Sequence, residues 1–107
     1  MRDMVWIEGL REGLSKSGKP TAYIYVRSQD GEGKVLAFPF GGPGRHHFHE
    51  FIRGIFGNEM DGLLSAKDYG TVFEKIDKEC LYEIEDYLEN GYQRYLLKDV
   101  WRPVDRI

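Results

Sequence analysis

The side chains best suited to chemistry in this sequence are the cations and tyrosines that follow residue 10. A turn rich in glycine and serine precedes a segment in which Tyr23 and Tyr25 alternate with apolar residues, so both rings are expected on one face of a strand. Cations neutralise phosphates and aromatic rings stack on bases, which is how many proteins hold a single-stranded nucleic acid. The candidate phosphate contacts are Arg11, Lys16, Lys19, Arg27 and Lys34.

Two further candidates lie near the C-terminus, where Tyr92 and Arg94 follow an Asn-Gly pair. Tyr23, Tyr25 and Tyr92 are equally suited to the ordinary outer surface of a barrel, and the sequence leaves both interpretations open. A nucleotide-binding loop is excluded, although Gly13, Gly18 and Lys19 have its spacing. Such a loop leads into a helix with Ser or Thr after the lysine, whereas here a proline and a strand follow.

The elements that must position these residues are mainly strands. Alternating hydrophobicity predicts strands at 5–10, 21–28 and 34–40, and helical spacing of apolar residues predicts a helix over 45–57. Residues 59–71 are expected to form a loop with one helical turn. The order up to this point is three strands and a helix.

The segment 72–101 has two interpretations, and they give different folds. In the first, Asn90-Gly91 is the turn of a hairpin that pairs Glu89 with Tyr92 and Glu83 with Lys98, and places Tyr82 opposite Asp99. The whole chain is then an OB-like five-stranded barrel of order β-β-β-α-β-β, the fold class we favour. In the second, residues 72–89 form a helix, and the fold is an α+β antiparallel sheet packed by helices.

The ten residues 11–20 carry a resemblance to a known family. Their pattern, Arg11-x-Gly-x-Ser-Lys16-x-Gly-Lys19-Pro20, resembles the early hairpin of the small single-stranded-DNA-binding proteins of filamentous phages. The resemblance implies an OB-fold homodimer in which Arg11, Lys16 and Lys19 help to hold phosphates. Thr21 stands where that family usually has an aromatic residue, and Tyr23 is the next ring along the chain.

Other reactive side chains have simpler explanations. His46, His49 and Glu50 would share one helix face and are the candidates for a metal site, but solvated or phosphate-facing histidines explain them better, and we expect no metal and no cofactor. Cys80 is expected to be a buried structural thiol. No nucleophile is paired with a base, so we expect no enzymatic activity.

Composition is consistent with one domain over residues 1–107. The net charge of −3 is unevenly distributed: residues 59–90 carry −7, and the segments on either side carry +2 each. A single cysteine, the lack of a long apolar run and an acidic N-terminal region suggest a protein of the cytoplasm of a bacterium or a phage-infected cell, without a membrane partner.

Two functions from different classes follow. The first is a single-stranded nucleic-acid-binding protein that acts through the basic, tyrosine-bearing hairpin. The second is a small acidic protein-binding module or inhibitor of phage origin, whose segment 59–90 imitates nucleic acid and engages a basic protein.

Overall fold

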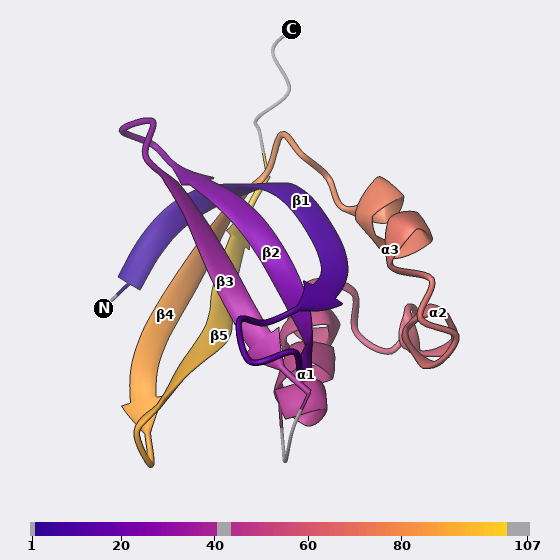
Figure 1. Ribbon diagram of the computed structural model, residues 1–107. Helices are drawn as coiled ribbons and strands as arrows, with labels where there is room; N and C mark the ends of the chain where they lie inside the picture. The colour runs from indigo at the N-terminus through magenta and orange to yellow at the C-terminus, as the bar shows by residue number, and fades with distance from the viewer. Residues whose placement is uncertain (1, 41–43, 103–107) are drawn as a thin grey trace, which may run out of the picture.

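The computed structural model describes residues 2–40 and 44–102, and one antiparallel sheet dominates it (Figure 1). Its strands follow the order β3-β2-β1-β4-β5 across the sheet. The strands are β1 (Arg2–Leu14), β2 (Pro20–Ser28), β3 (Gly33–Pro39), β4 (Leu81–Glu89) and β5 (Tyr92–Trp101). The mainly β fold predicted from the sequence is confirmed: five strands are present, and helix lies between the third and fourth, where three helices are found instead of the one or two expected.

Strand β1 is longer than the predicted range 5–10, because it serves two partners. Its first residues pair with β4, as in Val5 opposite Tyr82, and the remainder pairs with β2. The register with β2 shifts between Ile7 and Gly9, so Glu8 is the extra residue of a β-bulge. Such a bulge increases the local bend and twist, which lets one strand pass from one side of a curved sheet to the other.

Strands β3 and β5 end the sheet, and the space between them is covered by α1 (Gly44–Phe56). The rings of Phe38 on β3 and Tyr95 on β5 bridge this opening, with 5.5 Å between their centroids. Phe48 of α1 also packs against Phe38, at 5.6 Å. The sheet is therefore a partly open barrel whose opening is filled by aromatic side chains and a helix.

Residues 59–71 were expected to be a loop with one helical turn, and the structure shows more helix than that. Here α2 (Asp61–Ser65) is followed by α3 (Tyr69–Lys75), beside β1 (Figure 1). Asp68 caps α3, because its carboxylate accepts a hydrogen bond from the Thr71 backbone N–H at 3.2 Å. None of the helices in the described residues is long and apolar enough to cross a membrane.

The β4–β5 hairpin confirms the first interpretation of 72–101 and excludes a helix over 72–89. Asn90 and Gly91 both have positive φ, 53° and 81°, as the tightest hairpin turns require, and Glu89 faces Tyr92. The predicted register fails farther from the turn. A bulge between Glu83 and Ile84 leaves Lys98 without a partner in the pairing, so Glu83 pairs with Asp99 rather than with Lys98. That shift places Val100 opposite the buried Tyr82 instead of Asp99, so an apolar residue rather than a carboxylate faces the core.

The core lies between the inner face of the curved sheet and the helices. Residues alternate along β2 so that Ala22, Ile24 and Val26 are buried, as the sequence predicted. Leu88 departs from its expected place on the apolar face of the hairpin. It is exposed, because it lies next to the turn where the hairpin extends beyond the core.

Candidate nucleic-acid interface

Three side chains on the outer face of β1 and β2 form a stacked layer. The Arg11 guanidinium carbon lies 5.3 Å from the ring centroid of Tyr23 and 5.6 Å from that of Tyr25. Arg11 Nε donates a hydrogen bond to the Tyr25 hydroxyl at 2.5 Å, and the Tyr23 hydroxyl donates to the Leu14 carbonyl at 3.2 Å. We call Arg11, Tyr23 and Tyr25 the tyrosine–arginine layer, and both rings in it remain partly exposed.

Two glycines of β1 make room for this layer. In the pairing of the two strands, Tyr25 faces Gly9, and a Cβ at Gly9 would lie 3.0 Å from Cδ2 of that ring. A Cβ at Gly13 would lie 3.4 Å from Cε2 of Tyr23. The rings therefore lean over bare backbone, with part of each ring exposed to solvent. This role of Gly9 and Gly13 was not predicted from the sequence, although two glycines four residues apart, on one face of a strand, were the visible signal.

The loop that joins β1 to β2 presents two further cations at the Tyr23 end of the layer. Its turn is held by a hydrogen bond from the Ser15 N–H to the Lys19 carbonyl at 2.8 Å, and Gly18 supplies the positive φ of 78°. Lys16 and Lys19 are both exposed. The turn therefore carries Lys16 and Lys19 at the end of the two strands that hold Arg11, Tyr23 and Tyr25.

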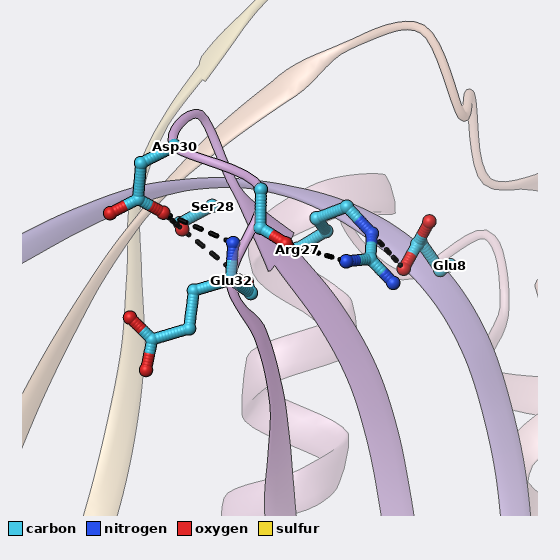
Figure 2. Close-up of polar contacts among 6 residues, drawn as sticks. Glu8, Arg27, Ser28, Asp30 and Glu32 are labelled. Atoms are coloured by element: carbon cyan, nitrogen blue, oxygen red, sulfur yellow. Dashed lines mark hydrogen bonds and ion pairs between the residues drawn. The ribbon is translucent and has the colours of Figure 1, made fainter.

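Arg27 lies on the same outer face but is occupied by protein groups (Figure 2). Its Nε contacts Glu8 Oε1 at 3.0 Å, and its Nη1 donates to the Gly31 carbonyl at 2.6 Å. Arg27 thus ties the β2–β3 turn to the bulge of β1. In that turn the carboxylate of Asp30 accepts bonds from the Ser28 hydroxyl and the Glu32 N–H, which lower the pKa of Asp30.

Lys34, a predicted phosphate contact, lies away from the tyrosine–arginine layer. It shares its side of β3 with the buried Leu36 and lies at the mouth of the barrel, near Asp3 and Asp86. The tyrosine–arginine layer is on the opposite face of the sheet. We therefore leave Lys34 out of the layer.

Tyr92 and Arg94 form a separate patch on the β4–β5 hairpin. β5 pairs with β4 and meets β3 only across the opening of the barrel, and it pairs with neither β1 nor β2, the strands that carry the layer. Tyr92 is 63% exposed, and Arg94, 9% exposed, stacks on it at 5.4 Å. Nε of Arg94 is buried and has no hydrogen-bond partner among the described residues.

The histidines of α1 do not assemble a metal site with their predicted partners. Within residues 2–40 and 44–102, no group of three or more His, Cys, Asp or Glu side chains is placed to hold an ion. Glu50 contacts Arg53 at 3.3 Å, and His46 is exposed. Burial, together with Arg45 and Arg53, lowers the pKa of His49, so this ring is neutral at pH 7.

The acidic segment 59–90 is spread over several elements, and many of its carboxylates have local structural roles. Asp61 forms two bonds with Arg53, at 2.9 and 3.0 Å, and Asp68 caps α3. Asp77 accepts a bond from the Glu79 N–H at 2.9 Å. Cys80 is buried as expected, which raises the pKa of its thiol.

The fold and the layer together define an OB-like barrel with an aromatic and cationic outer face on β1 and β2. A scan against protein-family models found no match for this chain, and a search of curated proteins found none either. A functional argument for this protein therefore rests on its own geometry.

Proposed function

We propose that this protein is a non-enzymatic single-stranded nucleic-acid-binding protein, of the kind that phages produce in the cytoplasm of their host. The observation that carries the proposal is the tyrosine–arginine layer. Two partly exposed rings lie over glycines on an outer sheet face, and Arg11 holds them in place from between. Such prealigned rings bind a ligand at a reduced cost in side-chain entropy.

In this proposal Tyr23 and Tyr25 each stack on one base, at about 1–3 kcal/mol per base. Lys16 and Lys19 contact the phosphates at the Tyr23 end, and the exposed N–H groups of Arg11 contact a phosphate between the two bases. None of these contacts distinguishes one base from another, so the layer itself binds with weak sequence preference. Phosphate contacts release counterions, so affinity falls as salt rises.

Fluorescence anisotropy with a labelled oligothymidine at several salt concentrations tests the proposal. We expect Tyr23→Ala and Tyr25→Ala each to weaken binding by about 5- to 150-fold, the equivalent of one stacked base. Tyr87→Ala is the matched control, because Tyr87 is a partly exposed strand tyrosine on β4, away from the layer.

The lysines are tested by the slope of log affinity against log salt. Lys16→Ala and Lys19→Ala should each make that slope shallower by about one unit, whereas Lys75→Ala on α3 should not. Absence of binding at low salt, or binding that does not respond to salt, would exclude this function.

A further inference from the structure

An open cleft lies on the outer face of the barrel, beyond the bulge of β1. Trp6, Ile7 and Glu8 line one side, and Lys78 and Glu79, which precede β4, line the other. The cleft is shallow and widely open to solvent, with a volume of about 600 Å³. Since Val5 and Ile7 are buried, strand alternation turns Trp6 outward, and its side chain is partly exposed.

This cleft continues the line of the tyrosine–arginine layer. Successive cross-strand pairs on the outer face are Arg11 with Tyr23, Gly9 with Tyr25, and Trp6 with Arg27, with the bulged Glu8 between the last two. Each pair carries one aromatic ring. Tyr23 and Tyr25 are alternate residues of β2, about 7 Å apart, and Trp6 lies on the neighbouring β1, opposite Arg27, the next outward residue of β2.

The groups around Trp6 are better suited to a base than to a phosphate. Two carboxylates, of Glu8 and Glu79, line the cleft with a single lysine. That lysine is already engaged: Lys78 Nζ donates to the carbonyls of Phe73 and Ile76 at 3.0 and 3.2 Å and lies 4.3 Å from the Phe73 ring centroid. Phosphate would therefore meet more negative than positive charge here.

We propose that the cleft is a third base-binding subsite that favours bases with an exocyclic amino group, such as cytosine, over thymine and uracil, which have none. This inference rests on the proposed function and adds base preference to it. Trp6 stacks on the base, and Glu8 and Glu79 accept hydrogen bonds from its exocyclic amino group. An ionised carboxylate only accepts hydrogen bonds. Thymine and uracil offer it a single ring donor, N3–H, which lies between two carbonyls that a carboxylate repels, whereas an amino group projects from the ring with two donors. Glu8 takes part although Arg27 binds its Oε1, because a carboxylate has several acceptor positions.

The emission of Trp6 reports directly on this subsite. The chain has two tryptophans, and Trp101→Phe leaves Trp6 as the only one. We expect an oligodeoxycytidine to quench Trp6 emission in that variant and to bind about fivefold or more tightly than an oligothymidine of equal length. Glu79→Gln should reduce this preference, with little change in affinity for oligothymidine, whereas Glu74→Gln on α3, outside the cleft, should preserve it.

The possible outcomes distinguish failure of the third subsite from failure of nucleic-acid binding itself. Oligonucleotide binding detected by anisotropy, with Trp6 emission unchanged, would overturn the third subsite while the proposed function stands. A cytosine preference that survives both Glu8→Gln and Glu79→Gln would overturn the role of the carboxylates. If no oligonucleotide binds at low salt, both proposals fall.

Discussion

A single methyl group at Gly9 tests whether the position of the Tyr25 ring matters for binding. In Gly9→Ala the new Cβ would lie 3.0, 3.4 and 3.5 Å from Cδ2, Cβ and Cγ of Tyr25. Ordinary carbon contacts are about 3.5–4.0 Å, so the ring must move by roughly half an ångström or more. The hydrogen bond from Arg11 Nε to the Tyr25 hydroxyl, now 2.5 Å, cannot survive such a shift unchanged.

The expected loss in binding is that of one stacked base, about 1–3 kcal/mol, or about 5- to 150-fold in Kd. Folding should be little affected, because the three atoms nearest the new methyl all belong to one partly exposed ring that can rotate. The change also removes a flexible glycine from a strand, which is worth about 0.5–1 kcal/mol in the opposite direction. We therefore expect the free energy of unfolding to change by less than about 1 kcal/mol.

Urea denaturation and oligonucleotide anisotropy on the same protein measure the two effects separately. Gly62→Ala is the matched control, because a Cβ at Gly62 meets nothing within 4 Å. It should leave binding unchanged. If Gly9→Ala folds normally and binds like the unaltered protein, the argument that the layer is prealigned for stacking is refuted.

Two further predictions concern stability. Burial raises the pKa of Tyr82 from 10.0 to about 12, so between those values the unfolded chain binds fewer protons than the folded one. The free energy of unfolding should therefore fall as pH rises from 10 to 12. Chemical denaturation at several pH values should show a smaller fall for Tyr82→Phe than for the unaltered protein. Gly91 has a φ of 81°, so Gly91→Val should lower the free energy of unfolding by about 1–2 kcal/mol. Asn90→Gly, at a φ of 53°, should lower it by less than about 1 kcal/mol, and thermal melts of the two variants measure the difference.

Local patterns in the sequence account for much of this fold, and long-range pairing accounts for the errors. The alternation around Tyr23 and the Asn-Gly turn are contained in a few neighbouring residues, and both were predicted correctly. The bulge after Glu83 depends on which β5 residue faces the core beside Tyr82, and no local rule contains that information. The full length of β1 was missed because its two ends pair with different strands.

The candidate site was predictable to a similar extent. Strand alternation is sufficient to place Tyr23 and Tyr25 on one face. It does not place Arg11 between them, because that position depends on the register between β1 and β2, which the bulge at Glu8 determines. Lys34 was predicted as a phosphate contact from its charge alone. On β3 its position has the same orientation as the buried Leu36, and charge does not show which face a residue occupies at the end of a barrel strand.

The net charge of −3 does not argue against nucleic-acid binding, but it changes how salt experiments must be interpreted. The acidic segment repels a nucleic acid at long range. Salt near physiological strength largely screens that repulsion beyond about 8–10 Å, and it also weakens the phosphate contacts of Lys16 and Lys19. The two effects have opposite signs. The measured salt slope of this protein would then underestimate its number of phosphate contacts. The change in slope on removing one lysine is not affected in this way, because the acidic segment is the same in both proteins, and it is therefore the better measure of each contact.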